Sequence, residues 1–156
     1  MKTLLVYFSD KETIRNFCSN SEDRNIDTVE IYEKYDRGFV VNRLVSGYKS
    51  IVGQGVCISR TDIDLSKYSS IVIAASMQAF CVPAAINDFL HKNNLSGMDV
   101  YGIIFGSRMF RAASEDLQRK IGLAGGSCKG VVCVKEGEIR KNECDVRALL
   151  KKKALN

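Results

Sequence analysis

A short polar segment, Ser9 to Thr13, follows an apolar run near the start of the chain and offers groups that bind anions. Ser9 and Thr13 carry hydroxyls, and Lys11 carries a positive charge. Where a buried strand leads into a helix, the exposed N–H groups and the dipole of the helix favour an anion such as phosphate. The same residues also match a capping box, in which Ser9 caps the helix and Glu12 bonds back to its N–H. The residues therefore support two interpretations, a phosphate site and a plain cap.

A second segment, Ser76 to Val82, is apolar for a loop. Phe80 could stack on a flat ring and Met77 could pack on it, while backbone groups of the loop, those of Gln78 and Ala79 among them, could bond the edge of the ring. The alternative is that Phe80 folds over the end of the sheet as part of the core. This segment is the second candidate for a binding loop.

A third segment, Gly106 to Arg111, combines backbone freedom at Gly106 with the aromatic ring of Phe110. Ser107 and Arg108 lie within it, and Arg108 and Arg111 could meet an anionic group or an acidic partner. The alternative for both arginines is an ordinary solvated position. This segment is the third candidate loop.

The elements that must position these loops alternate along the chain between apolar β-type runs and helical patterns. The strands are expected at Thr3–Phe8, Asp27–Tyr32, Ser70–Ala75, Asp99–Phe105 and Val131–Val134. The helices are expected at about 11–20, 39–52, 83–93 and 112–123, with a last one from Asn142 or Asp145 to Ala154. The second of these helices is amphipathic, with apolar residues such as Leu44 and Tyr48.

Such alternation predicts an α/β fold, a doubly wound five-stranded parallel sheet in the order 2-1-3-4-5 with a helix layer on each face. Right-handed crossovers make the strand order reverse between the first and third strands, and ligands bind outside the carboxyl ends of the strands at that point. The three candidate loops all follow strands at this edge. We therefore expect them to surround one crevice.

Length and composition limit the classes of protein to consider. A chain of 156 residues, 46% of them hydrophobic, fits a single domain over residues 1–156 with a proper core. No apolar run approaches the roughly 20 residues of a membrane helix, and the first apolar run is too short for a signal peptide, so we expect a cytoplasmic protein without a membrane span. The net charge of +5 includes Lys151 to Lys153, a run too short to indicate a nucleic-acid partner.

The six cysteines and the single histidine, His91, do not form a recognisable metal or disulfide pattern. No Cys-x-x-Cys occurs, so we expect no metal site and interpret most cysteines as small buried hydrophobes. Cys81 stands close to the start of a helix and is a candidate reactive thiol, although no histidine near it in sequence would serve as its base.

At its three loops the sequence resembles the flavodoxin-like family, whose members bind FMN and transfer electrons. The resemblance runs over roughly residues 1–154 and is carried by Lys2–Ser9, by Tyr68–Ser76 and by the helix-forming Pro83–Leu90. The middle segment is also similar to the flavodoxin-like protoporphyrinogen dehydrogenases.

The resemblance implies FMN as the cofactor and assigns a part of it to each loop. Ser9, Lys11 and Thr13 match the phosphate loop, the segment Ser76–Phe80 matches the loop over the flavin ring, and Gly106–Arg108 match the second ring loop. The implied function is electron transfer or a small flavin-dependent reductase or dehydrogenase, with a redox partner protein or a quinone-like or porphyrin-like substrate. The alternative is an interaction module that has kept the fold and lost the cofactor.

Overall fold

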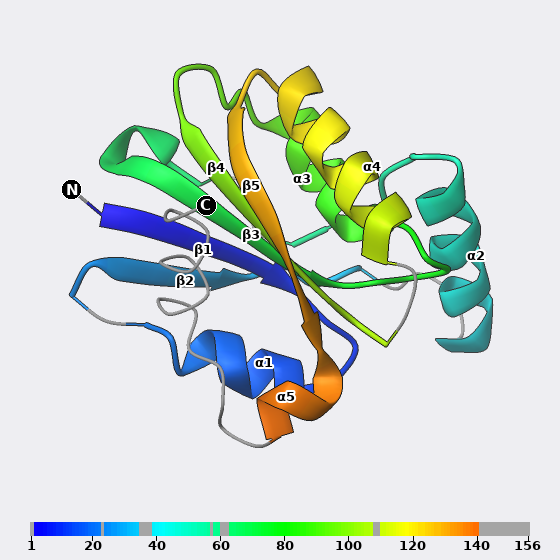
Figure 1. The fold of residues 1–156 in the computed structure, drawn as a ribbon. Helices are drawn as coiled ribbons and strands as arrows, with labels where there is room; N and C mark the ends of the chain where they lie inside the picture. The colour runs from blue at the N-terminus through cyan, green and yellow to red at the C-terminus, as the bar shows by residue number, and fades with distance from the viewer. Residues whose placement is uncertain are drawn as a thin grey trace.

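Five parallel strands form one sheet in the order β2-β1-β3-β4-β5, which confirms the predicted order and fold class (Figure 1). The computed structural model describes residues 2–22, 24–34, 39–56, 58–59, 63–107 and 110–140. The strands are β1 (Lys2–Phe8), β2 (Ile26–Glu30), β3 (Tyr68–Ser76), β4 (Asp99–Gly106) and β5 (Ser127–Lys135). All four pairings are parallel, so the carboxyl ends of β1, β3 and β4 meet at one edge.

The helices lie on both faces of this sheet (Figure 1). One face is covered by α1 (Glu12–Ser19) and α5 (Glu136–Arg140), which contact each other. On the other side lie α2 (Phe39–Ile51), α3 (Ala84–Lys92) and α4 (Phe110–Leu123). A short 3₁₀ helix, Leu65–Lys67, leads into β3. The result is the three-layer arrangement that alternating strands and helices predict.

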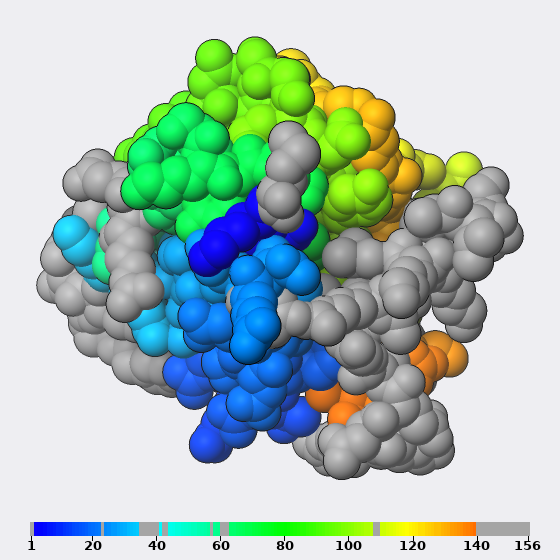
Figure 2. All heavy atoms as spheres, turned by 90° about the vertical axis from the view of Figure 1, so that its left-hand side faces the viewer, coloured from blue at the N-terminus to red at the C-terminus, as the bar shows by residue number. Residues whose placement is uncertain are grey.

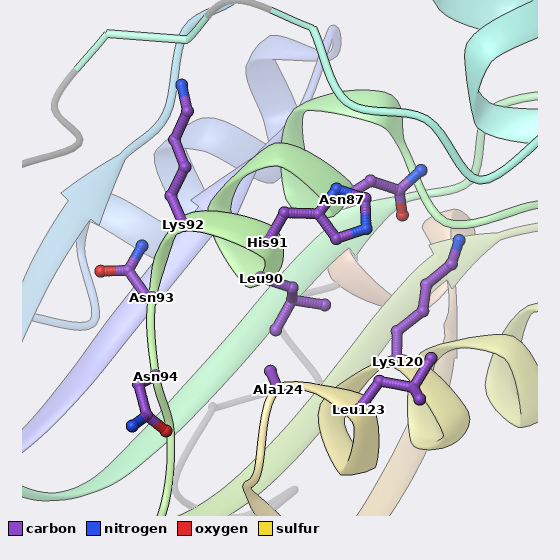
Figure 3. A pocket seen from close by; sticks show the side chains of 9 residues that line it. All are labelled: Asn87, Leu90, His91, Lys92, Asn93, Asn94, Lys120, Leu123 and Ala124. Atoms are coloured by element: carbon purple, nitrogen blue, oxygen red, sulfur yellow. The ribbon is translucent and has the colours of Figure 1, made fainter.

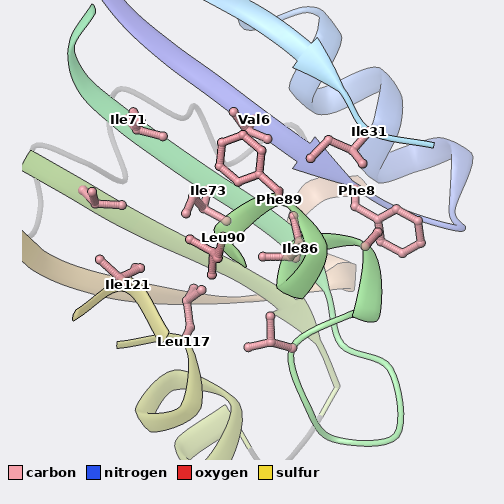
Figure 4. Packing of buried hydrophobic residues seen from close by; sticks show 14 of the residues in the cluster. Val6, Phe8, Ile31, Ile71, Ile73, Ile86, Phe89, Leu90, Leu117 and Ile121 are labelled. Atoms are coloured by element: carbon pink, nitrogen blue, oxygen red, sulfur yellow. The ribbon is translucent and has the colours of Figure 1, made fainter. Parts of the chain in front are cut away.

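Each strand divides its side chains between the two faces because successive residues point to opposite sides. In β1, Leu4, Val6 and Phe8 belong to the core beneath α3 and α4, whereas Leu5 and Tyr7 belong to the core beneath α1 and α5. Figure 4 shows the first of these cores, in which side chains of the sheet meet those of α3 and α4. The helical side chains labelled there are Ile86, Phe89, Leu90, Leu117 and Ile121.

The carboxyl-terminal part of the chain differs from the prediction. β5 begins at Ser127, four residues before the predicted start at Val131. The prediction missed this part of the strand because polar residues before Val131 hide the strand pattern, and the pairing there has an irregular register near Gly130. A helix that the sequence did not predict, α5, follows β5 directly. The last predicted helix, from Asn142 or Asp145 to Ala154, lies outside the described residues.

The amino ends of the strands form the face opposite the candidate loops, shown in Figure 2 with the dark blue start of β1 between light blue and green residues. There the Lys2 Nζ lies 2.8 Å from Asp27 Oδ1, and the Tyr68 hydroxyl donates to Asp27 Oδ2 at 3.0 Å. These bonds join β2, β1 and β3 at their beginnings. No helix in the described part of the chain is long and apolar enough to cross a membrane.

Candidate functional site

The three loops predicted to share a crevice are brought together at the carboxyl edge of the sheet. The Ser76 hydroxyl, at the end of β3, donates to Asp10 Oδ1 in the loop after β1 at 3.4 Å. The Met77 N–H donates to the Phe105 carbonyl of β4 at 3.0 Å. Each of these bonds joins two of the three loops or their strands, as the reversal of strand order requires.

The first loop leaves the start of α1 open rather than capped by a side chain. The helix begins at Glu12, so Lys11 is the N-cap residue, with extended backbone (φ −108°, ψ 124°) and no side-chain cap bond. Ser9 Oγ instead accepts the Lys11 N–H at 3.0 Å, one position before the helix. The capping-box interpretation is therefore wrong, because the helix starts too late for Ser9 to reach its first-turn N–H groups.

The charged residues of this loop contact neighbouring elements. Lys11 Nζ lies 2.5 Å from Glu136 Oε1 at the start of α5, so its charge is shared with a carboxylate that follows β5. Sequence reasoning missed Glu136, because it predicted no helix directly after β5. Ser9 is buried, whereas Thr13 is exposed on the first turn of α1. An anion at this helix end would accept hydrogen bonds from the Thr13 hydroxyl and from the open N–H groups of α1. The negative charge of Asp10 would repel it.

The second loop contains a tight turn with an unfavourable backbone at two positions. Gln78 and Cys81 exchange backbone hydrogen bonds of 3.1 and 2.9 Å, and between them Ala79 and Phe80 have φ values of 47° and 63°. Positive φ at both central residues is typical of a type I′ turn, which normally takes asparagine and glycine. The turn holds Phe80 with 56% of its surface exposed, so the interpretation of Phe80 as a core residue is wrong.

The side chain of Met77 lies against the third loop. A Cβ added to Gly106 would stand 2.2 Å from Met77 Cε and 3.3 Å from the ring of Phe110. A side chain at the end of β4 would therefore displace the terminal methyl group of Met77. Ser107, the next residue, is exposed, and Arg108 lies outside the described residues.

Two serines of α2 attach this helix to its neighbours, and one of them, Ser50, contacts the second loop. Ser50 Oγ accepts the N–H of Ala84 at 2.9 Å and lies 3.2 Å from Gln78 Oε1. One turn earlier, the Ser46 hydroxyl donates to Glu33 Oε2 at 2.5 Å. These bonds attach α2 to the loop and to the segment after β2. Hydroxyl side chains within a mostly apolar helix pattern were the signal for this anchor, and the sequence reading did not use it.

Glu33 is a buried carboxyl that sequence reasoning also missed. Only 8% of its surface is exposed, and its Oε1 has no hydrogen-bond partner among the described residues. Burial raises the pKa of Glu33, the hydrogen bond from Ser46 opposes this, and the nearby charge of Asp10 raises it further. No sequence pattern marks this glutamate, because its burial depends on how α2 packs beside the sheet.

Cys18, Cys81 and Cys128 are free thiols. Cys18 is buried, as predicted, and burial raises its pKa to about 12. Cys81 and Cys128 are half-buried, however, and Cys133 is exposed, so the expectation that most cysteines are buried is confirmed for Cys18 alone. The remaining two, Cys57 and Cys144, lie outside the described residues. Within the described part of the chain, no cluster of side chains could hold a metal ion.

A groove between α3 and α4 lies apart from the three loops (Figure 3). Its lining includes Asn87, His91, Lys92 and Lys120, and none of the predicted site residues. The two lysines are paired within their own helices, Lys92 with Asp88 at 2.7 Å and Lys120 with Asp116 at 2.6 Å. The groove therefore does not belong to the candidate site.

Similar structures among known proteins identify the fold of this chain. No family model and no curated protein matches the chain in sequence. Among solved structures, the chain is similar to a proposed flavoprotein from Bacteroides eggerthii, with 17% identity, a TM-score of 0.65, and coverage of 96% of this chain and 98% of that one.

Two further structures give the same result. A flavoprotein in complex with FMN from Lactobacillus acidophilus has 16% identity and a TM-score of 0.58, with 92% and 99% of the two chains covered. Oxidised flavodoxin 1 from Bacillus cereus has 13% identity and a TM-score of 0.53, with 90% and 91% covered. The chain has the flavodoxin-like fold, as its sequence predicted.

Proposed function

We propose that this protein binds FMN at the three loops and acts as a redox protein of the flavodoxin type. The observation that carries the proposal is the open N-terminus of α1 after β1, in a loop that Ser76 Oγ joins through Asp10 to the segment with the strained turn that presents Phe80. An anion-binding helix end and an exposed aromatic ring on loops at the same edge of the sheet match a cofactor with a phosphate at one end and a flat ring at the other.

The first loop fits the phosphate by the chemistry of its donors. Without a side-chain cap, the first N–H groups of α1 are available to phosphate oxygens, and Thr13 and Ser9 add hydroxyls. Lys11 adds a positive charge that it shares with Glu136. Asp10 and Glu12 oppose the anion, and the affinity reflects this balance of charges.

The second and third loops are assigned to the ring. Phe80 is exposed and available for stacking. Within the segment from Ser76 to Ala79, the backbone of Ala79 is the candidate for the ring edge, because the Met77 N–H and both backbone groups of Gln78 are already bonded within the protein. We assign Gly106 and Ser107 to the other side of the ring, and the sequence adds Arg108, which lies outside the described residues. When bound, the flavin supplies the one- and two-electron chemistry, and the loops orient it and tune its potential.

The partner in this proposal is a redox protein or a small quinone-like or porphyrin-like substrate. The net charge of +5 favours an acidic partner surface or an anionic substrate over a basic one. The likeness to protoporphyrinogen dehydrogenases stays a prediction from the sequence, as does a cytoplasmic location.

The first test is the absorption spectrum of the purified protein, followed by titration with FMN and fluorescence detection. We expect a flavin spectrum or saturable binding of added FMN. Colourless protein that gives no titration signal would refute the proposal and favour the interaction module without a cofactor.

Two substitutions test the phosphate site itself. Thr13→Glu places a negative charge in the first turn of α1, where the helix dipole stabilises it, so the fold is kept while FMN affinity falls by about tenfold or more. Ser19→Glu is the matched control, because it adds the same charge about 9 Å further along the helix. Asp10→Asn removes an adverse charge and is expected to tighten FMN binding by about two- to fivefold. Equal affinities in all three variants would place the phosphate elsewhere.

A further inference from the structure

Helix α2 turns small polar side chains toward the protein. Ser46 and Ser50 are 3% and 1% exposed, and their hydroxyls make the bonds to Glu33 and to the N–H of Ala84. A surface helix normally directs its apolar stripe inward and its polar residues to solvent. Among the residues of α2 whose side chains are described, the buried ones are these two serines.

The outer face of the same helix is apolar. Val41, Leu44, Tyr48 and Ile51 are exposed by 48%, 71%, 65% and 62%, and Val52 directly after the helix by 44%. The first four follow one another at intervals of three, four and three residues, which is the spacing of the a and d positions of a heptad. We call these five residues the α2 seam. The sequence predicted an amphipathic helix here, and only the structure shows that its apolar side faces outward.

The position of α2 explains why the described chain does not cover this seam. The helix stands at the edge of the molecule beyond α3, and α3 is the described element against which it mainly packs (Figure 1). Its serine bonds orient it on that side. The seam is thereby directed away from both cores.

We propose that the α2 seam is the contact between two copies of this chain. An a/d seam packs best against another seam of the same spacing, and a second copy supplies one. The five exposed side chains present on the order of 500 Å² of apolar surface, the size of the largest apolar patch on a typical monomer, which is often functional. Two such seams bury about 1,000 Å² in total, near the lower limit for a specific interface.

The absence of charge on the α2 seam makes it a face on which two copies of the same net charge can meet. Each copy carries a net charge of +5, so two copies repel over most of their surfaces. The α2 seam contains no charged residue, so it is a face where two copies can approach without placing like charges in contact. The interface rests on α2 alone and is independent of whether FMN binds.

The test is the mass of the full-length protein in solution, measured by light scattering and sedimentation over a range of concentrations. We expect a concentration-dependent species of twice the 17.4 kDa chain mass. Leu44→Glu places a charge in the middle of the seam and should weaken association by at least 100-fold. The control is Leu123→Glu on α4, where the leucine is 76% exposed and outside the seam, and this variant should associate like the wild type.

A second readout follows burial of the seam directly. The chain has no tryptophan, so Tyr48→Trp introduces a single reporter. Its emission should shift to shorter wavelength as concentration rises, and should stay solvent-like when Leu44→Glu is added. The proposal is wrong if the wild-type protein is monomeric at every concentration. It is also wrong if Leu44→Glu and Leu123→Glu weaken association equally, or if a monomeric wild-type protein binds a different protein through α2.

Discussion

Replacing Ala79 by glycine tests the strained turn that presents Phe80. Ala79 and Phe80 have φ values of 47° and 63°, and the turn is closed by backbone bonds between Gln78 and Cys81. A left-handed backbone costs an L-residue roughly 1–2 kcal/mol, a cost that glycine does not have. Glycine in turn makes the unfolded chain more flexible, which costs about 0.4–1 kcal/mol. Ala79→Gly should therefore raise the free energy of unfolding by about 0.5–1 kcal/mol.

Urea denaturation measures this change, with a matched alanine in an ordinary conformation as control. Ala112, in the first turn of α4, has a helical backbone, so Ala112→Gly should lower the free energy of unfolding by roughly 0.5–1 kcal/mol. The two variants make the same chemical change with opposite signs. If Ala79→Gly destabilises the protein as much as Ala112→Gly does, the turn is not strained and the reasoning fails.

Two further predictions concern the packing of the core and the buried carboxyl of Glu33. Gly102→Ala should destabilise the protein by about 1–3 kcal/mol, because a Cβ would stand 2.7 Å from Leu117 Cδ2. Gly122→Ala on α4, where the added Cβ meets nothing within 4 Å, should stabilise the protein by up to about 1 kcal/mol. Thermal unfolding measures both changes, and if both glycine variants shift the stability in the same direction, this reasoning is wrong. Since the folded state raises the pKa of Glu33 and so binds its proton more tightly, stability should fall as pH rises above the ordinary glutamate range. Glu33→Gln should remove that part of the pH dependence, whereas exposed Glu138→Gln should leave it unchanged, and identical pH profiles for wild type and Glu33→Gln would contradict the assignment.

Most of the fold could be predicted because its signals are local. The continuous apolar runs of β1 and β3 are short and rich in β-branched and aromatic residues, which favours strands covered on both faces, and the intervals between them fit right-handed crossovers. The order of the strands and the meeting of three loops follow from that connectivity. β5 was predicted too short, because its first residues are polar and its pairing there is irregular.

The candidate site was predicted at the level of its loops and not of its contacts. The segments from Ser9 and Ser76 lie together as expected. Whether Ser9 caps α1 depends on where the helix begins, which is a matter of one or two residues that sequence patterns do not resolve. The contact of Lys11 with Glu136 depends on an element that the pattern did not reveal.

The sequence by itself determined the layered α/β architecture and the strand order, since hydrophobic periodicity and chain connectivity are properties of neighbouring residues; the place of a ligand at the carboxyl edge of the sheet stays a prediction from that order. Only the tertiary structure decided that the turn at Ala79 is strained, that Glu33 is buried, and that α2 directs its serines inward and its apolar seam outward. The physical reason is that an amphipathic pattern states which residues share a side of a helix, whereas the packing of distant segments decides which side faces the protein.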